Sequence, residues 1–174
     1  MISSKALSFG SFRLSSGRIS DYYIDLRRIP SYPESFREVL DAYEQVIKGI
    51  GTDRFARIAG VPLTGLVYAA VVSLDLSKPL LFVRRERKDY GMARFVEGEF
   101  SKGDTVLLVD DVATTGSSLL SSAERLIDEG CVVKDAVVLI DRNEGATQKL
   151  KDHGIELHSF TTITELYSFF EHMR

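Results

Sequence analysis

The sequence predicts one α/β domain over residues 1–174, with a mainly parallel central sheet flanked by helices. Strand-like and helical segments alternate through the middle of the chain, which is the order that βαβ units produce. The strand-like segments, clearest at 105–109 and 136–140, are continuous apolar runs, as expected for parallel strands covered on both faces. A length of 174 residues is sufficient for one such core, and the hydrophobic fraction of 44% is typical of a globular domain.

The helices and strands can be assigned in order from their periodicity. Between residues 33 and 48, apolar side chains recur at the i, i+3, i+4, i+7 spacing of an amphipathic helix, and Gly49 and Gly51 are expected to end it. Thr164 is the expected N-cap of the last helix. The remaining helices are expected at 66–74, 117–129, 143–152 and 164–173, and the strands at 57–60, 80–83, 105–109, 136–140 and 155–160.

Charge and cysteine content limit the possible partners. The 22 basic and 25 acidic residues give a net charge of −3, so no overall field attracts nucleic acid and any anion site must be built locally. The single cysteine, Cys131, cannot form an internal disulfide and is expected to be a buried, inert thiol. No apolar run reaches the roughly 18 residues of a membrane span, and no secretory signal is visible. We therefore expect a soluble, cytoplasmic protein without a membrane partner.

The most informative motif follows the strand at 105–109. Two adjacent acids, Asp110 and Asp111, end the strand, and a short loop of small and hydroxyl residues leads into a helix. Ligands of open parallel sheets bind at the carboxyl ends of strands, and backbone N–H groups in such a loop form an anion site. Gly116 lets the backbone approach a ligand closely. The hydroxyl donors suited to a phosphate are those of Thr114, Thr115, Ser117 and Ser118.

The acid pair beside this loop indicates the kind of ligand. Two carboxylates would repel a phosphate unless other groups lie between them, and sugar hydroxyls can donate to each carboxylate. The motif therefore predicts a phosphorylated ribose. The alternative is an acid pair at a strand end whose second member caps the following helix. Neither a Walker A motif nor a Rossmann G-x-G-x-x-G motif occurs.

Four segments resemble a known family in the same order along nearly the whole chain. Val-Asp-Asp-Val-Ala-Thr-Thr-Gly-Ser-Ser at 109–118 resembles the phosphoribosyl-diphosphate signature of type I phosphoribosyltransferases. Residues 6–25, with Phe-Gly, Ser-Gly-Arg and Tyr-Tyr elements, resemble the N-terminal region of orotate phosphoribosyltransferases. The basic segment 84–98 and the Asp-Arg-Asn-Glu-Gly element at 141–145 resemble their mobile catalytic loop and orotate-binding element. The resemblance implies the type I phosphoribosyltransferase fold, with a small N-terminal hood over residues 1–30.

The resemblance also implies residue roles. Lys88, Arg85 and Asp111 are the expected catalytic residues, since cations suit a departing diphosphate and the acid suits the ribose hydroxyls. The expected orotate ligands are Thr114, Arg142, Tyr23 and Ile24. The expected ligands of the donor, 5-phosphoribosyl 1-diphosphate, are Arg84, Arg85, Lys88, Tyr90, Asp110, Asp111, Val112, Ala113, Thr114, Thr115, Gly116, Ser117 and Ser118.

Structural alternatives exist for several of these residues. The basic run could be a solvated face, Tyr22 and Tyr23 could be core residues, and Arg142 could form a surface ion pair with Asp141 or Glu144. The chain also departs from many bacterial members of the family at three positions. Ser15, Tyr90 and Thr64 stand where those members have a lysine, a histidine and a lysine.

The implied reaction transfers the phosphoribosyl group to N1 of orotate, giving orotidine 5′-monophosphate and diphosphate, a step of UMP synthesis. Mg²⁺ is expected to bind mainly through the donor, with no metal site built from the protein alone. A homodimer is implied, in which Arg85 acts in the neighbouring subunit's site. The rival functions are a purine or uracil phosphoribosyltransferase and a ligand-sensing transcriptional regulator on the same fold, which would need a DNA-binding element.

Overall fold

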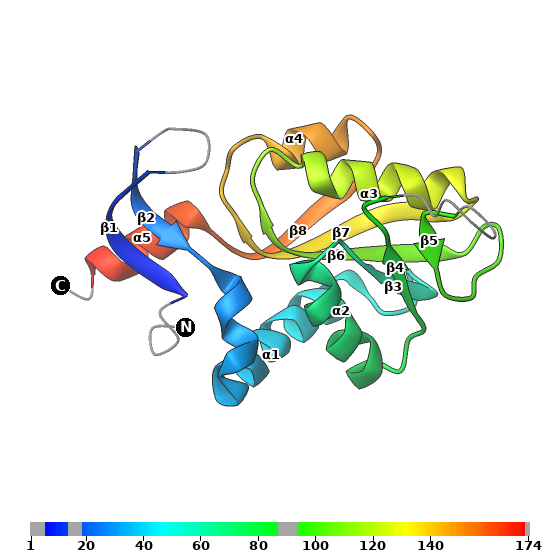
Figure 1. The fold of residues 1–174 in the computed structure, drawn as a ribbon, viewed down its shortest axis with the longest axis horizontal. Coiled ribbons are helices and arrows are strands. Elements are labelled where there is room, and N and C mark those ends of the chain that lie inside the picture. Colours follow the sequence, from blue (N-terminus) through cyan, green and yellow to red (C-terminus); the bar gives the residue numbers. More distant parts are fainter. Residues whose placement is uncertain (1–5, 14–18, 87–93, 173–174) are drawn as a thin grey trace. The chain divides into compact units, whose positions relative to one another are not determined.

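The computed structural model describes residues 6–13, 19–86 and 94–172, which fall into two compact units, Met1–Asp41 and Ala42–Arg174 (Figure 1). The first unit contains an antiparallel hairpin of β1 (Leu7–Arg13) and β2 (Ile19–Ile24). A 3₁₀ helix, η1 (Leu26–Ser31), follows, and α1 (Pro33–Ile50) begins in this unit. Sequence periodicity did not indicate the two strands, because the hairpin residues alternate poorly between apolar and polar.

The second unit is built on a six-stranded sheet in the order β5-β4-β3-β6-β7-β8. Neighbouring strands are parallel except β4 and β5, which confirms the predicted mainly parallel sheet. Helices α3 and α4 cover one face and α2 covers the other (Figure 1). The strands are β3 (Arg57–Gly60), β4 (Leu80–Val83), β5 (Val96–Glu97), β6 (Thr105–Ala113), β7 (Val132–Asp141) and β8 (Glu156–Thr162). The helices are α2 (Thr64–Asp75), α3 (Ser117–Asp128), α4 (Ala146–Lys151) and α5 (Ile163–Glu171).

Every predicted strand and helix of this unit is present, and the differences lie at their ends. β6 continues to Ala113, beyond the acid pair where the apolar run stops, because its backbone remains paired with β7 as far as Asp141. Strand pairing uses backbone groups, so polar side chains do not end it. α4 starts at Ala146 rather than at 143, since Asn143 and Gly145 both have left-handed backbone angles, with φ of 54° and 104°.

The N-cap expected at Thr164 is wrong, because the cap of α5 is Thr162. Its hydroxyl accepts a hydrogen bond from the Glu165 N–H at 3.2 Å, and its own N–H donates to the Glu165 carboxylate at 2.7 Å. This reciprocal pair is a capping box. The backbone hydrogen bond from Thr162 is the main reason that the pKa of Glu165 is lowered.

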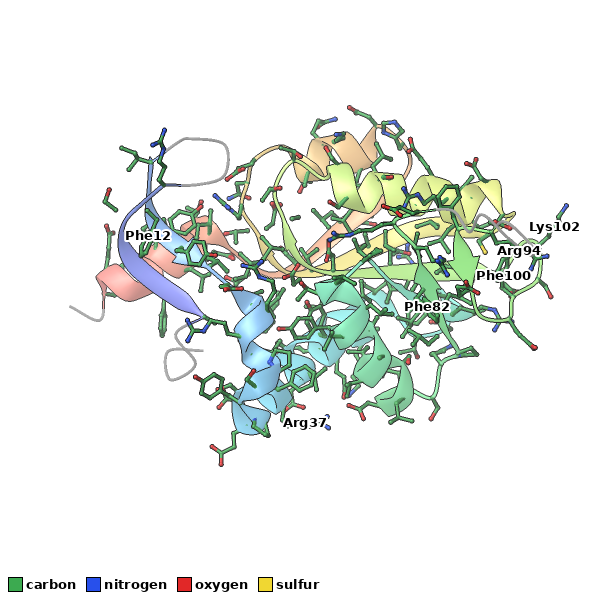
Figure 2. All side chains as sticks on the ribbon, viewed as in Figure 1. Phe12, Arg37, Phe82, Arg94, Phe100 and Lys102 are labelled. Atoms are coloured by element: carbon green, nitrogen blue, oxygen red, sulfur yellow. The ribbon has the colours of Figure 1, made fainter. Side chains whose placement is uncertain are left out.

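One face of the sheet packs in a core that includes the fully buried Leu108, Leu119 and Leu126. Cys131 belongs to this core and is 4% exposed, as predicted for an inert thiol. Phe100, labelled in Figure 2, packs against the same core. In the part of the chain that the structure describes, no helix is both long and apolar enough to cross a membrane.

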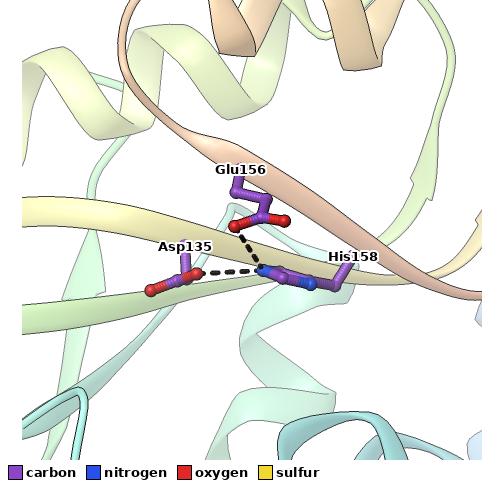
Figure 3. Close-up of side chains that lie close together, drawn as sticks. All are labelled: Asp135, Glu156 and His158. Carbon is purple, nitrogen blue, oxygen red and sulfur yellow. Dashed lines mark hydrogen bonds and ion pairs between the residues drawn. The ribbon is translucent and has the colours of Figure 1, made fainter. Parts of the chain in front are cut away.

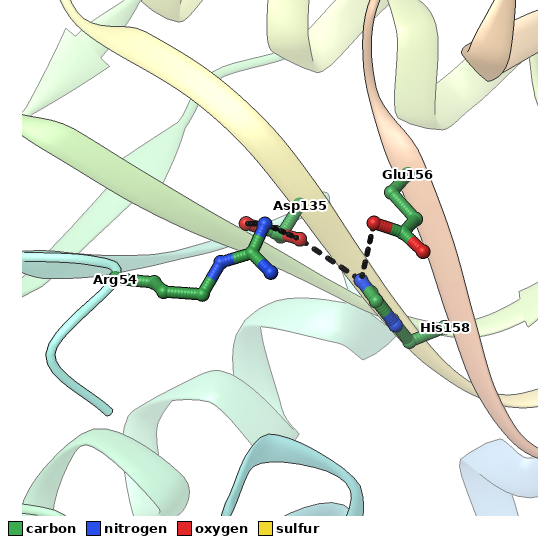
Figure 4. Close-up of polar contacts among 4 residues, drawn as sticks. All are labelled: Arg54, Asp135, Glu156 and His158. Carbon is green, nitrogen blue, oxygen red and sulfur yellow. Dashed lines mark hydrogen bonds and ion pairs between the residues drawn. The ribbon is translucent and has the colours of Figure 1, made fainter. Parts of the chain in front are cut away.

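A polar cluster lies near the amino ends of β7 and β8, away from the strand ends that carry the acid pair (Figures 3 and 4). Arg54 Nη2 donates to both oxygens of the buried Asp135 at 3.1 Å, and His158 Nε2 lies 2.9 Å from Asp135 Oδ1. Glu156 lies 4.0 Å from the same imidazole nitrogen. The ligand atoms of Asp135, Glu156 and His158 lie close enough together to hold a metal ion. Arg54, however, already pairs with Asp135 and balances its charge. We interpret the cluster as a network that ties β7 and β8 to the loop before β3.

The capping box yields a stability prediction. Thr162→Ala should lower the free energy of unfolding by about 1 kcal/mol, because it removes the side chain that caps α5. That loss corresponds to a decrease of about 2–4 °C in Tm for a chain of this size. Thr164→Ala is the control, since it removes only an exposed hydrogen bond with Asn143. Thermal unfolding of the two variants should rank Thr162→Ala lower, and the reverse order would refute the assigned cap.

Candidate functional site

The loop that joins β6 to α3 forms a small pocket. Gly116 has a φ of +76° and is the N-cap residue of α3, with no side-chain cap bond. The pocket has a volume of about 50 Å³. It is lined by Asp110, Val112, Ala113, Thr114, Thr115, Gly116, Ser117, Ser118 and Leu119. Nearly all the donor-binding residues expected from this motif therefore surround one cavity at the start of a helix, the geometry that suits a phosphate.

The acid pair is held by its own backbone. Asp110 is 8% exposed, and its carboxylate accepts the Asp111 N–H at 2.9 Å. The Asp111 carboxylate accepts the Val112 N–H at 3.0 Å. Since Gly116 is the cap residue of α3, the structure contradicts the alternative in which the second acid caps the helix.

Burial changes the protonation of this pair. Desolvation, followed by repulsion from Asp111, raises the pKa of Asp110 from 3.8 to about 8. Two neighbouring carboxylates in a dry site do not both ionise easily. Hydroxyl donors from a bound sugar would stabilise the charged forms, so the pair is better suited to a sugar than to an anion.

The floor under the acid pair is tightly packed. The Tyr43 hydroxyl, fully buried on α1, donates to the Asp110 carbonyl oxygen at 2.8 Å. Gly65 on α2 lies so close that a Cβ there would be 2.5 Å from the Val109 carbonyl oxygen and 2.8 Å from the Asp110 Cα. Only glycine fits at this position without a backbone shift. The close packing of α2 on β6 therefore fixes the position of the backbone that carries the acid pair.

Arg142 lies beside the pocket, at the end of the neighbouring strand. Its backbone N–H donates to the Ala113 carbonyl oxygen at 2.9 Å, and its guanidinium Nη2 pairs with Glu144 at 2.7 Å. Asp141 instead accepts hydrogen bonds from the Asn143 N–H and the Thr147 hydroxyl. Of the two ion pairs considered from the sequence, the one with Glu144 is present, and the Arg142 side chain is only 16% exposed.

The basic segment is described only at its two ends. Lys88 and Tyr90, and with them Arg87, lie outside the described residues. Arg84 pairs with Glu97 at 3.1 Å, and Arg85 Nη2 lies 3.4 Å from the Pro62 carbonyl oxygen.

Arg125 on α3 holds both ends of that segment. Its guanidinium donates to the Arg84 carbonyl oxygen and lies over the Phe95 ring at 4.7 Å. It also lines a second pocket, of about 320 Å³, whose other walls include Arg85. Ser117 and Ser118 line both pockets, which therefore adjoin each other.

The two remaining expected orotate ligands lie in the first unit. Tyr23 and Ile24 are on β2, where Ile24 is paired with Leu7. Tyr23 is 38% exposed, and the centroid of its ring lies 5.7 Å from that of the Phe12 ring. The Tyr23 hydroxyl accepts a hydrogen bond from Arg27. The alternative that Tyr23 is a core residue is wrong, and its role toward a base stays a prediction.

Three residues near the site were not identified from the sequence. Tyr43 lies in the amphipathic helix predicted at 33–48 but was not singled out, and Arg125 has no sequence signal beyond its place about two turns into α3. Lys149 on α4 donates to the Ser117 hydroxyl at 2.8 Å. The alternation of strands and helices could have suggested this contact, because α4 follows the strand next to β6.

Comparison with known proteins shows the following similarities. The family model of the phosphoribosyl transferase domain matches residues 27–164. An orotate phosphoribosyltransferase of Cenarchaeum symbiosum is 44% identical over 94% of this chain and 82% of its own length. Uridine 5′-monophosphate synthase of Bos taurus is 40% identical over 98% of this chain, which spans 35% of that longer protein. The crystal structure of orotate phosphoribosyltransferase from Aeropyrum pernix superposes with a TM-score of 0.83 at 39% identity, covering 98% of this chain and 96% of that one.

The raised pKa of Asp110 predicts a pH-dependent stability difference. The folded protein holds this proton more tightly than the unfolded chain, so the contribution is complete below pH 3.8 and is lost as pH rises toward about 8. Asp110→Asn keeps the acceptor for the Asp111 N–H and removes the titration. Its Tm relative to the wild type should therefore rise by at least about 3 °C between pH 5 and pH 8.5.

Asp128→Asn, an exposed change on α3, is the control and should differ from the wild type by the same amount at both pH values. Differential scanning calorimetry without ligand measures both comparisons. A pH-independent difference for Asp110→Asn would mean that this carboxyl is not destabilised by burial.

Proposed function

The chain belongs to the orotate phosphoribosyltransferases of the phosphoribosyl transferase domain family, and from this premise we propose how its own residues bind the substrates. The observation that carries the proposal is the direct hydrogen bond between the Arg142 backbone and Ala113 in the pocket loop. It joins a small pocket lined by backbone N–H and hydroxyl donors to a guanidinium that can bind a carboxylate. The two substrate groups would thus lie on adjacent strand ends of one sheet.

The donor would occupy the end of β6. Its 5′-phosphate would lie in the small pocket, where backbone N–H groups and the hydroxyls of Thr114, Thr115, Ser117 and Ser118 can donate to it. The ribose hydroxyls would donate to Asp110 and Asp111. Because the Asp110 carboxyl is largely buried, a bound sugar would supply the hydrogen bonds that water gives elsewhere.

Departure of the diphosphate leaves positive charge at C1′ of the ribose, and Asp111 is the residue of the pair expected to act there. The leaving group would meet Arg84, whose carbonyl oxygen accepts a hydrogen bond from Arg125 of the second pocket, and Arg85 of the neighbouring subunit. Lys88 remains the expected catalytic cation of the same segment. Carboxylate and substrate oxygens are the ligands that Mg²⁺ prefers, so the residues present fit a magnesium ion brought by the donor. When bound, that ion would neutralise charge on the departing diphosphate.

Orotate would bind at the end of β7. Its carboxylate suits the planar guanidinium of Arg142, which now pairs with Glu144. Thr114, in the pocket loop, offers a hydroxyl between the two substrates. That Tyr23 and Ile24 flank the flat base stays an expectation from the family resemblance.

The assembly and compartment belong to the same proposal. A homodimer in which Arg85 acts in the neighbouring subunit agrees with the exposure of this side chain. A cytoplasmic location agrees with a single cysteine, which is buried and forms no disulfide.

The activity is tested by following orotate consumption by absorbance with the phosphoribosyl donor and Mg²⁺. Adenine, guanine and uracil are tested in parallel, each with diphosphate release as a second measurement. Orotate should be used at least about a hundredfold better than any other base, because only orotate carries the carboxylate. Preference for a purine or for uracil would contradict the proposed substrate.

The role of Arg142 predicts a change in base preference. Arg142→Ala should lower kcat/KM for orotate by roughly ten- to a hundredfold, the value of a charged hydrogen bond, and leave weak uracil activity almost unchanged. Arg142→Lys should recover only part, since an ammonium lacks the planar fork. Glu144→Gln is the matched control, because it removes the present partner but not the guanidinium. An unchanged ratio of the two specificity constants in Arg142→Ala would remove Arg142 from the base site.

A further inference from the structure

The pocket at the start of α3 has a charge imbalance. A phosphate monoester carries close to two negative charges near neutral pH. The residues that line the pocket include the carboxyl group of Asp110, and none of them is a lysine or an arginine. Backbone N–H groups and the end of α3 supply only partial positive charge. A full positive charge next to the pocket would therefore increase phosphate affinity.

Lys149 supplies such a charge from α4. Its Nζ donates to the Ser117 hydroxyl oxygen at 2.8 Å, and that oxygen lies 3.1 Å from the Thr115 hydroxyl. Lysine can only donate, so the Ser117 proton remains available for another acceptor. Donation by an ammonium also makes Ser117 a stronger donor. Lys149, Ser117 and Thr115 are thus linked by hydrogen bonds, and the last two line the pocket.

The backbone fixes this arrangement. The Ala146 N–H at the start of α4 donates to the Thr114 carbonyl oxygen at 3.2 Å. A Cβ on Gly116 would lie 3.0 Å from the Ala146 Cα, so α4 packs directly on the pocket loop. Lys149 lies three residues after Ala146, on the same side of the helix. Its half-buried side chain is thus directed to Ser117 by the docking of α4.

We propose that Lys149 is a further binding residue for the 5′-phosphate, acting through Ser117 and directly on the phosphate charge. This inference rests on the proposed function, because it assumes that the pocket holds the phosphate of the donor. Lys149 would bind the phosphate in the donor and equally in the nucleotide product. It therefore sets affinity for phosphorylated ribose, and not the rate of diphosphate departure.

Lys151 offers a matched control. It carries the same charge on the same helix, it is exposed, and two residues along a helix turn its side chain to the other side. Lys151→Gln removes one positive charge from α4 without removing the contact to Ser117. Any difference between the variants then reports the contact and not the overall field.

The experiment is calorimetric titration of ribose 5-phosphate and, separately, of inorganic diphosphate into the wild type, Lys149→Gln, Lys149→Arg and Lys151→Gln. Lys149→Gln should weaken ribose 5-phosphate binding about tenfold, the lower range for a charged hydrogen bond because the side chain is half exposed. Its diphosphate affinity should change less than about twofold. Lys149→Arg should recover most of the loss, and Lys151→Gln should match the wild type.

Steady-state kinetics provides an independent measurement. Lys149→Gln should raise KM for the phosphoribosyl donor about tenfold, with kcat and KM for orotate within about twofold of the wild type. Equal ribose 5-phosphate affinity in Lys149→Gln and the wild type would overturn the proposal, as would equal losses in both glutamine variants. A wild type without orotate-dependent diphosphate release would contradict the proposed function instead, and the calorimetric titration would still decide the role of Lys149.

Discussion

The parallel pairing of β6 with β7 is the constraint on which the site depends. Its register places Ala113 opposite Asp141, so the loop after β6 and the turn after β7 leave the sheet side by side. The hydrogen bond from the Arg142 N–H to Ala113 continues this pairing beyond the ladder. Backbone geometry would therefore set the spacing between the proposed phosphate site and the proposed base site. Side chains determine what binds at each strand end, but they do not determine how far apart the two ends lie.

The packing of α1 and α2 against β6 holds the backbone of the acid pair in place. Tyr43 binds the Asp110 backbone from α1, and Gly65 brings α2 against β6 within the reach of a backbone contact. This close packing excludes water from the Asp110 carboxyl and raises its pKa. The free protein is thereby less stable near neutral pH than it would be with a neutral residue there. Such a local loss of stability is common where a protein holds groups ready for a ligand.

The sequence was sufficient for the fold class, for every strand and helix of the second unit except the two-residue β5, and for the residues around the small pocket. Those features depend on apolar runs and on a local motif, both of which can be identified from the order of the residues alone. The hairpin of β1 and β2 was not predicted, because its residues lack clear alternation. The cap of α5 was assigned to Thr164 instead of Thr162, since both threonines lie at the start of the helical segment and only the contact with Glu165 distinguishes them.

The contacts missed around the site are those between distant segments. Lys149 reaches Ser117 across more than thirty positions, and Arg125 holds the Arg84 carbonyl oxygen across more than forty. Such pairs depend on how helices dock on the sheet, which periodicity does not give. Whether Tyr23 and Ile24 face the base depends in the same way on tertiary placement and stays a prediction.

The ion pair between Arg142 and Glu144 makes substrate binding an exchange reaction. Glu144 is a resident carboxylate, so an incoming carboxylate takes the place of a group of the same charge as the partner of Arg142. A neutral base gains nothing from the guanidinium and leaves the resident pair in place. Binding of a carboxylate at this strand end would then depend on the affinity of Arg142 for that carboxylate relative to its affinity for Glu144. Because the guanidinium is already paired, much of its desolvation cost is the same in both states. The internal competitor also sets a minimum strength that any external carboxylate must exceed before it is held.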